Sequence, residues 1–431
     1  MKALIIGNGG REEALAWKVS QSPLISDIFL APGNGGSLHK CHNVEVDISN
    51  FSAVVSVIKA KDIQLVVVGP EVPLVDGLVD CLLADPALSD LYIVGPTKSG
   101  AALEGSKDFA KAFMKRHNIP TAKYRTFTSN TIEEGLRYLR EEECPPYVLK
   151  ADGLAAGKGV LILNTLEEAE SAMRDMLEGK FGDASASVVV ETYLEGIECS
   201  VFVLTDGKDY RILPTAKDYK RIGDGDKGLN TGGMGAVSPV PFVDDRFMDK
   251  VAQRIIEPTI QGLRDEGIDY RGFIFFGLMN RGGDPYVIEY NCRMGDPETE
   301  AVMMRIEGDF VPAMLSLRDQ TLGETKPIKE SSEIATTVVA VSGGYPEAYA
   351  KGKVISGVLE ANEEPGTQIF DMGTKRTLAG ELVTAGGRVL AVTALGKTAE
   401  EAIQKAYHRL GSIDFEGITY RRDIGQDLLK M

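Results

Sequence analysis

The sequence lacks features that several large classes of protein need. No apolar run among its 431 residues approaches the length of a membrane span, and no basic flank or cleavage site typical of a signal peptide stands at its start. Its five cysteines are far apart, odd in number and without any Cys-x-x-Cys pair, as in proteins of reduced compartments. We therefore expect a cytoplasmic protein that neither spans a membrane nor relies on disulfide bonds.

Positive charge is also scarce. A formal net charge of −16 argues against proteins that wrap nucleic acid or lie on an anionic membrane. It does not argue against small phosphate ligands, because these respond to local side chains and helix ends. His39, Cys41 and His42 could suggest a metal site, but no second pair at ligand spacing accompanies them. A solvated loop is the better interpretation.

The first hundred residues alternate short apolar runs with amphipathic stretches. The apolar runs predict buried strands at residues 3–6, 28–30, 65–68 and 92–94. The amphipathic stretches predict helices at residues 12–20, 52–60 and 75–83. This alternation predicts an open parallel α/β sheet with helices on both faces. Ligands of such sheets bind at the carboxyl ends of the strands, which here carry GNGGRE (7–12), APGN (31–34) and GPE (69–71).

The pattern changes near residue 106 and again, softly, near residue 325, so the length fits two to four domains. Strands are predicted at residues 147–150, 160–163, 188–191, 199–204, 273–279, 286–289, 335–341 and 388–393. Helices are predicted at residues 166–177, 246–266 and 399–410. Thr165 and Glu168 form a capping box for the first of these helices. We expect an α+β arrangement after the first sheet.

The turn GNGGRE can hold an anion, because it follows a strand and opens a helix. A dinucleotide fingerprint fails in two respects. Glu12 stands where the last glycine is required, and the second strand ends without a carboxylate for a ribose hydroxyl. Arg11 beside the glycines favours a monophosphate, such as that of a phosphosugar. A purely structural turn is the alternative.

The loop KADGLAAGKG, residues 150–159, carries two lysines and three glycines between two strands. Lys150 ends the first strand, where a fixed ammonium can meet a phosphate. Gly157 and its neighbours let the backbone fold over phosphate oxygens, and Lys158 adds charge at the tip. The loop is not a Walker A motif. A structural hairpin is the alternative, which two lysines among so many glycines disfavour.

Two further segments carry candidate binding residues. Glu289 and Asn291 end a strand and project on the same face, as a carboxylate and amide pair suited to Mg²⁺ beside nucleotide phosphates. The alternative there is a polar strand face towards solvent. The glycine-rich loop NTGGMGA, with Asn230 and Gly232, follows Asp218 and several cations, which suits a small zwitterion. A flexible surface loop explains it equally well.

These blocks, in this order, resemble the phosphoribosylamine–glycine ligase (glycinamide ribonucleotide synthetase) family, ATP-grasp enzymes of purine biosynthesis. The resemblance covers essentially the whole chain. It rests on GNGGRE, APGN, VGPE (68–71), LEGSK (103–107), KADGLAAGKG, NTGGMGA, IEYNCR (288–293) and GDPET (295–299). It implies a carbon–nitrogen ligase that joins glycine to 5-phosphoribosylamine through glycyl phosphate, giving glycinamide ribonucleotide, ADP and phosphate. We also expect a monomer.

The resemblance implies a domain division and a role for each matching residue. The domains are a phosphoribosylamine-binding domain at 1–104, an ATP-grasp domain at 105–325 with a mobile lid at about 122–190, and a C-terminal α+β domain at 326–431. The implied ATP contacts are Lys107, Lys150, Glu191, Leu194 and Glu198. The implied ligands of Mg²⁺ or Mn²⁺ are Glu289 and Asn291. Those near glycine and its acyl phosphate are Asp218, Arg293 and Asp296. Those for phosphoribosylamine are Gly9, Gly10, Arg11, Asn34, Pro70 and Glu71.

The chain departs from the family pattern at three positions. Glu13 and Tyr219 each replace a frequent histidine, and Met294 replaces a frequent phenylalanine. Glu13 is expected one step beyond the phosphate contacts, and Tyr219 removes any role of an imidazole at that position. Three other functions stay open: an ATP-grasp ligase or carboxylase acting on another acid, a nucleotide-binding regulatory protein without catalysis, and, least favoured, an NAD-dependent dehydrogenase.

Overall fold

The computed structural model describes residues 1–36, 41–155, 157–358 and 365–430. Of the residues considered above, His39 and Ala156 lie outside this part of the chain. Cys41 and His42 lie in strand β3 (Cys41–Asn43), at the edge of the first sheet. Within the described residues, no three His, Cys, Asp or Glu side chains gather as a metal site would require.

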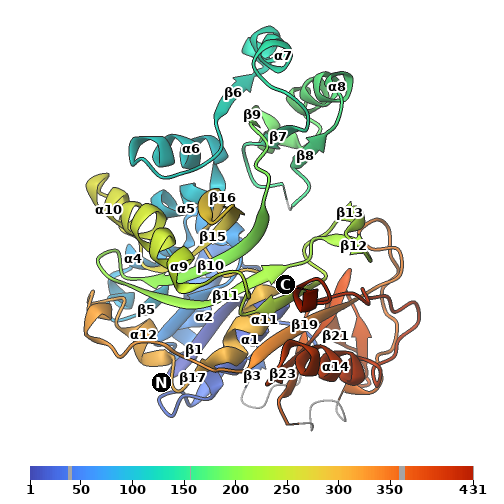
Figure 1. The fold of residues 1–431 in the computed structure, drawn as a ribbon. Coiled ribbons are helices and arrows are strands. Elements are labelled where there is room, and N and C mark those ends of the chain that lie inside the picture. The colour runs from blue at the N-terminus through green and yellow to red at the C-terminus, as the bar shows by residue number, and fades with distance from the viewer. Residues whose placement is uncertain (37–40, 156, 359–364, 431) are drawn as a thin grey trace.

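Five parallel strands form the N-terminal sheet, in the order β3-β2-β1-β4-β5. The other four strands are β1 (Lys2–Gly7), β2 (Asp27–Pro32), β4 (Leu65–Val68) and β5 (Tyr92–Val94). In its centre, Ile5 of β1 lies between Leu30 of β2 and Val67 of β4. The expected open parallel sheet is confirmed; it is blue in Figure 1.

Alternate side chains of β1 enter two different cores. Ala3 and Ile5 belong to the core that includes residues of helix α1 (Gly10–Ser20). Leu4 and Ile6 belong to the core that includes residues of α2 (Phe51–Lys61). Both faces of the sheet are therefore covered, as is usual for parallel sheets.

The single helix expected over residues 75–83 is wrong. The chain instead forms α3 (Glu71–Asp76) and α4 (Leu78–Leu83), separated by Gly77 with φ +96°. Because L side chains rarely adopt this conformation, glycine is the residue that can end one helix here and begin the next. Helix α3 begins at Glu71, close to the carboxyl end of β4, and Gly77 ends it.

A four-stranded antiparallel sheet with two helices stands apart at the top of Figure 1. Its strands, in the order β6-β9-β7-β8, are β6 (Tyr124–Thr128), β7 (Tyr147–Ala151), β8 (Val160–Leu163) and β9 (Ser187–Glu191). The helices are α7 (Ile132–Glu141) and α8 (Leu166–Leu177), and the expected capping box of α8 is present. This unit has a hydrophobic core of its own.

The largest sheet has eight strands and includes segments from the middle and the end of the chain. Its order is β16-β15-β10-β11-β14-β19-β23-β20. The strands are β10 (Ile197–Thr205), β11 (Tyr210–Asp218), β14 (Gly235–Ser238), β15 (Gly272–Arg281), β16 (Asp284–Asn291), β19 (Ile334–Val341), β20 (Thr367–Asp371) and β23 (Arg388–Gly396). Because β14 pairs with β19, the sheet continues without a break past residue 325.

The remaining elements connect these sheets. The helices are α5 (Lys98–Gly105), α6 (Lys107–Arg116), α9 (Asp245–Val251), α10 (Glu257–Asp265), α11 (Glu298–Arg305), α12 (Val311–Leu315) and α14 (Ala399–Leu410). A π-helical turn, Ala252–Ile256, joins α9 to α10 within the expected helical run. The short strand pairs are β12 (Arg221–Gly223) with β13 (Lys227–Asn230), β17 (Ile306–Glu307) with β18 (Lys329–Glu330), and β21 (Thr374–Arg376) with β22 (Leu382–Thr384). Across the described ranges, every helix is too short or too polar to cross a membrane.

Candidate active site

The glycine turn between β1 and α1 is closed by the side chain of Glu12. Its carboxylate accepts a hydrogen bond from the backbone N–H of Gly9 at 2.7 Å and contacts Nε of Arg11 at 2.5 Å. A Cβ at Gly9 would lie 2.9 Å from Oε2 of Glu12, so a side chain at this position would displace the carboxylate that closes the turn. The residue that argued against a dinucleotide fingerprint is therefore the one that caps helix α1.

The backbone carbonyl of Met294 joins two arginines that come from distant parts of the sequence. Arg11 donates to this oxygen through Nη1 at 3.3 Å, and Arg293 donates to it through Nη1 at 3.2 Å. The structure thus brings the expected phosphoribosylamine subsite next to the expected glycine subsite. Met294 itself is buried, so its departure from the family pattern lies in the core, and only its backbone faces these arginines.

Arg293 is held by two carboxylates on its other side. Its Nη2 lies 2.7 Å from Glu104 of α5, and its Nε lies 3.3 Å from Glu71 of α3. Burial alone would raise the pKa of Glu71, but the charges of Arg293 and Arg11 lower it below its ordinary value. Burial does prevail at Glu104, whose pKa is raised despite Arg293. Pro70 is the N-cap residue of α3 and brings Glu71 to this place.

Asn34 connects the first sheet to the C-terminal part of the chain. Its Nδ2 donates to the carbonyl of Asp371 at 2.9 Å, and to Asn8 O and Glu13 Oε2, each at 3.3 Å. Its Oδ1 accepts from the N–H of Gly36 at 2.8 Å. Glu13 is buried, so this departure from the family pattern affects the support of Asn34.

Lys150 and Glu191 form a buried triad with Lys111 of α6. One carboxylate oxygen of Glu191 lies 2.9 Å from Nζ of Lys150, and the other lies 3.0 Å from Nζ of Lys111. All three side chains are at most 5% exposed. Burial lowers the pKa of Lys111 to about 8. The carboxylate of Glu191, a residue expected in the adenosine pocket, fixes the position of the Lys150 ammonium.

The remaining residues expected around ATP lie on helix α6, on the lid and on the chain that leads out of the lid. Lys107 Nζ donates to the carbonyl of Gly153 at 3.1 Å and so touches the glycine loop. Gly157 adopts φ +74°, and its Cα lies close to the NTGGMGA loop, because an added Cβ would be 3.9 Å from Thr231 O. Lys158 is exposed at the tip, and Leu194 is half-buried between β9 and β10.

A pocket lies on the eight-stranded sheet near Lys107 and Lys150. It is lined by Glu198, Cys199, Ser200, Asp218, Lys220, Phe275, Gly277, Leu278, Ile288 and Glu289. Lys220 Nζ lies 2.8 Å from Glu198, and the charges of Glu198 and Asp218 raise the pKa of Lys220. Burial raises the pKa of Asp218. The pocket therefore contains three carboxylates and only one ammonium among its lining residues.

Glu289 and Asn291 fit a divalent cation at the edge of this pocket. Both lie near the end of β16, two residues apart, so that their side chains leave the same face of the sheet. Asn291 is 8% exposed, and its Nδ2 has no hydrogen-bond acceptor among the described residues. Amide oxygen and nitrogen are interchangeable by rotation, which would direct the oxygen into this unsatisfied position. Oxygen donors of these two types are those that Mg²⁺ prefers.

Residues of the NTGGMGA loop and the GDPET turn are held together by the C-terminal segment. Gly232 donates its N–H to Oη of Tyr345 at 3.0 Å, and its carbonyl accepts from Nη1 of Arg388 at 2.8 Å. The same Nη1 lies 2.8 Å from Oδ1 of Asp296. Asn230 is exposed at the end of β13. Gly232 and Asp296, both expected near glycine, are therefore neighbours.

Several charged residues of this cleft had not been anticipated. Lys111 could have been identified, because it follows Lys107 by one helical turn on α6 and lies on the same face. Glu104 and Arg388 give no local signal, since their partners are far away in the sequence. Glu298 is buried on α11, and burial together with the charge of Asp218 raises its pKa to about 8.

The hydroxyl of Tyr219 points away from the cleft. It donates to Oδ1 of Asp427 at 2.5 Å and accepts from the N–H of Gly425 at 3.1 Å. The ring is buried, with the guanidinium of Arg421 at 5.2 Å from its centroid. Tyr219 thus anchors the C-terminal segment and offers no group to the reaction.

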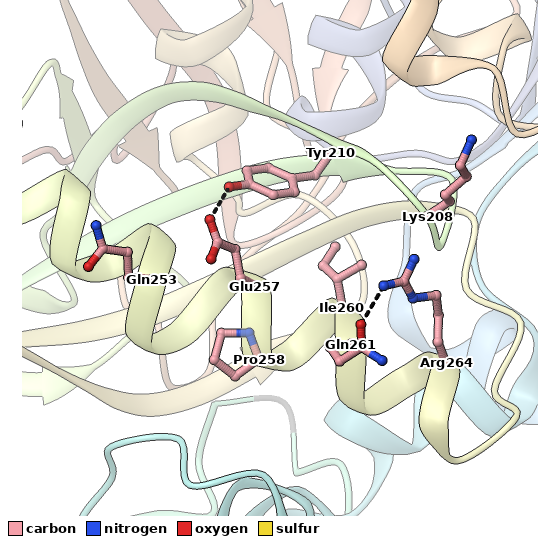
Figure 2. A pocket seen from close by; sticks show the side chains of 8 residues that line it. All are labelled: Lys208, Tyr210, Gln253, Glu257, Pro258, Ile260, Gln261 and Arg264. Atoms are coloured by element: carbon pink, nitrogen blue, oxygen red, sulfur yellow. Dashed lines mark hydrogen bonds between the residues drawn. The ribbon is translucent and has the colours of Figure 1, made fainter.

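A second hollow, of about 340 Å³, lies between β11 and α10 (Figure 2). It is lined by Lys208, Tyr210, Gln253, Glu257, Pro258, Ile260, Gln261 and Arg264. Tyr210 donates to Glu257 at 3.5 Å across it. None of the expected site residues lines this hollow, so the cleft with the converging lysines and carboxylates is the better candidate for the active site, although it offers less open volume.

Comparison with known proteins identifies one family along nearly the whole chain. Residues 1–104, 105–299 and 335–427 match the N domain, the ATP-grasp (A) domain and the C domain of phosphoribosylglycinamide synthetase. Phosphoribosylamine–glycine ligase from Vibrio cholerae is 49% identical over 99% of this chain and 98% of its own. The enzyme of that name from Escherichia coli K12 is 47% identical over the same shares.

Solved structures give the same result. The crystal structure of phosphoribosylamine–glycine ligase from Thermotoga maritima superposes with a TM-score of 0.84 at 37% identity, covering 98% of this chain and all of that one. A biotin carboxylase domain from Hydrogenobacter thermophilus, solved with MgADP, has a TM-score of 0.70 at 16% identity, covering 97% of this chain and 91% of that one, and shares the fold alone. The expected α/β and ATP-grasp architecture is confirmed. The chain belongs to the phosphoribosylamine–glycine ligase family, carbon–nitrogen ligases that use ATP to join glycine to phosphoribosylamine in purine biosynthesis.

Proposed function

We propose that the cleft between the lid and the eight-stranded sheet performs this ligation in two steps. A glycine carboxylate oxygen attacks the γ-phosphorus of ATP, and the bond to the β-phosphate oxygen breaks, giving glycyl phosphate and ADP. The amine of phosphoribosylamine then attacks the glycyl carbonyl, and inorganic phosphate leaves as the amine loses a proton. The first step is necessary because a free carboxylate has no adequate leaving group.

The buried triad of Lys111, Glu191 and Lys150 supports the first step. Phosphoryl transfer depends mainly on positioning and on neutralising charge around the phosphate oxygens. An ammonium that is already fixed by a buried carboxylate needs no reorganisation when the nucleotide binds. Lys150 and Lys107, with Gly157 and Lys158 on the loop above, are the residues that we assign to the ATP phosphates.

We assign the metal to Glu289 and Asn291, with Mg²⁺ or Mn²⁺ as the ion. Glu289 and Asn291 would hold such an ion, whose positive charge would help to neutralise the phosphate oxygens during phosphoryl transfer. The carboxylate and amide pair, in a pocket next to the lysines, supports this assignment. Glu191, Leu194 and Glu198, at the exit from the lid, are assigned to the nucleoside.

The two other substrates are assigned to opposite sides of the Met294 carbonyl. Asp218, Arg293 and Asp296, with Asn230 and Gly232, are assigned to glycine and its acyl phosphate. The turn at Gly9–Arg11, with Asn34, Pro70 and Glu71, is assigned to phosphoribosylamine. The shared contact of Arg11 and Arg293 with one carbonyl supports placing the amine near the acyl group.

A cytoplasmic location and a monomeric state also remain predictions, which cell fractionation and gel filtration would test.

Isotope transfer tests the proposed intermediate directly. With glycine labelled by ¹⁸O in both carboxylate oxygens, we expect one labelled oxygen in each inorganic phosphate released. Release of unlabelled phosphate during product formation would refute the acyl phosphate.

A panel of amino acids, scored by ADP release, tests the substrate. Turnover that requires both glycine and phosphoribosylamine supports the assignment, and a response to another acid without glycine would exclude it.

A further inference from the structure

The C-terminal segment reaches the cleft through Arg388, the first residue of β23. Its Nη1 donates to the carbonyl of Gly232 at 2.8 Å and to the carbonyl of Asp296 at 2.9 Å. The same atom lies 2.8 Å from the carboxylate of Asp296. One guanidinium nitrogen thus contacts two loops that are more than sixty residues apart in the sequence.

The contact with Gly232 depends on close packing as well as on the hydrogen bond. A Cβ at Gly232 would lie 3.0 Å from Cζ of Arg388 and 3.2 Å from Nε and Nη2. The guanidinium therefore lies against the glycine with no room for a side chain between them. Tyr345 holds the other side of the same residue, because its hydroxyl accepts the N–H of Gly232 at 3.0 Å.

Charge explains why an arginine suits this place. The side chains of Arg388 and Asp296 are 19% and 12% exposed, so Arg388 compensates the charge of a largely buried carboxylate at close range. Glu300 of α11 is fully buried next to it, and both of its carboxylate oxygens lack hydrogen-bond donors among the described residues. Interaction with Asp296 and Glu300 raises the pKa of Arg388, although burial and Arg11 act in the opposite direction.

We propose that Arg388 is a positioning residue for the glycine subsite, which fixes the NTGGMGA loop and the GDPET turn relative to each other. The proposal rests on the assignment of Gly232 and Asp296 to glycine. Arg388 acts through them, since its contacting nitrogen is already occupied by the two loops. The ATP contacts at Lys107, Lys150 and Glu191 are on other elements and should be unaffected.

Kinetics with each substrate varied in turn test this proposal. In R388Q we expect kcat/KM for glycine to fall at least tenfold more than kcat/KM for ATP. R388K should recover part of the loss, because an ammonium keeps the positive charge beside Asp296 but lacks the planar guanidinium that packs against Gly232. Y345F, which loses the acceptor for Gly232 N–H, should show the same preference for glycine at smaller size. R246Q is the matched control, because Arg246 of α9 is exposed and lies on an element to which no substrate is assigned.

Equal losses for glycine and ATP, or no loss in R388Q, would overturn the proposal. If R388Q does not fold, R388K and Y345F provide the same comparison, and their unchanged selectivity would overturn it as well. Thermal unfolding of each variant separates a local effect from a general loss of structure. Absence of glycine-dependent ADP release in the unmodified protein would instead refute the assignment of the glycine subsite on which this proposal rests.

Discussion

Buried charges at the site come as groups in which each member compensates another. Glu191 is shared by Lys111 and Lys150, and Arg293 is shared by Glu71 and Glu104. Removing the shared member of such a group, Glu191 or Arg293, leaves buried charges without compensation, which costs about 3–5 kcal/mol. These groups are therefore sensitive points at which position and stability are coupled.

Lys111 offers a test of this coupling. In K111M, Glu191 keeps only Lys150 as its partner, so the Lys150 ammonium should be drawn towards the carboxylate and away from a bound phosphate. We expect a rise of about tenfold or more in KM for ATP, with a smaller loss of stability than the ~3–5 kcal/mol of an unpaired buried charge, because Glu191 keeps Lys150 as a partner. K115M on the exposed face of the same helix is the control. Unchanged ATP affinity in K111M would show that the triad does not position Lys150.

Asp371 should make stability depend on pH. Burial raises its pKa to about 6 in the folded chain, whereas an unfolded aspartate titrates near 3.9. The folded state therefore retains a proton that the unfolded state releases. The contribution of this group to stability is fully present below pH ~4 and is lost as the pH rises through about 6. Glu13, buried beside it, adds repulsion, while Thr374 and Arg376 favour the charged form.

Titration of Asp371 should lower the free energy of unfolding by on the order of 2–3 kcal/mol as the pH rises from below ~4 to above about 6. We predict that Tm falls between pH 4.5 and 7.5 by less in D371N than in the unmodified protein, because asparagine does not titrate and can still accept from Thr374. Scanning calorimetry across this range gives the comparison. An identical fall of Tm in both proteins would mean that Asp371 carries the same charge in the folded and unfolded states.

At the residue scale, the sequence indicated groups whose partners are near in the chain. Glu289 and Asn291 could be paired because strands alternate with period two, and GNGGRE could be identified because the strand, turn and helix are consecutive. Arg388 and Glu104 could not be identified, since their contacts depend on tertiary packing. The orientation of Glu191 towards the lysines was missed for the same reason.

Among the elements, the last stretch of the chain, residues 421–427, supports the site without contributing reactive groups. Residues 421–427 contact the β12–β13 hairpin, where Arg421 pairs with Asp226 and donates to Arg221 O. The same segment receives the hydroxyl of Tyr219. Residues 421–427 therefore support the β12–β13 hairpin, which leads to Gly232.

Tyr219 provides a prediction at this scale. Y219F removes a buried hydrogen bond to Asp427 and the acceptor for Gly425 N–H, so we expect a loss of about 1–3 kcal/mol. Hydrogen exchange should increase in residues 221–230 and 421–427, while KM for ATP stays within a factor of two. Y286F, whose hydroxyl makes no hydrogen bond within the described residues, serves as the control. A large effect on turnover at full stability would indicate a catalytic hydroxyl instead.

Element boundaries were well predicted wherever the hydrophobic period was clear, as for β1, β4 and α14. The exception at residues 75–83 has a local cause. An apolar face continues through both α3 and α4, so periodicity alone cannot show that Gly77 takes a left-handed conformation. The π-helical turn between α9 and α10 was not predicted either, because the polar and apolar faces continue through it.

The whole molecule is more continuous than the expected three-part division suggests. One hydrophobic core includes Ala3 of the first sheet, Phe202 of the central strands and Leu390 of the C-terminal strands. The eight-stranded sheet passes residue 325 through the pairing of β14 with β19. Only the lid, within the described residues, has a core cluster separate from the rest.

This continuity predicts the result of a truncation. A chain that ends at residue 325 would leave β14 as an unpaired edge and expose apolar side chains of the shared core, which favours aggregation. We expect residues 1–325 to be insoluble or to unfold without a cooperative transition, whereas the full chain unfolds cooperatively. A soluble, folded fragment that binds ATP would show that the boundary near residue 325 separates independent units.

The most direct test of the account is the ATP turnover of two single variants. Lys150 and Glu289 lie on different strands, β7 and β16, and are assigned to the phosphates and to the metal. We predict that K150A and E289A each lose at least a hundredfold in glycine-dependent ADP release, while circular dichroism and gel filtration match those of the unmodified protein. Near-normal turnover in either correctly folded variant would contradict the assignment of this cleft as the site of phosphoryl transfer.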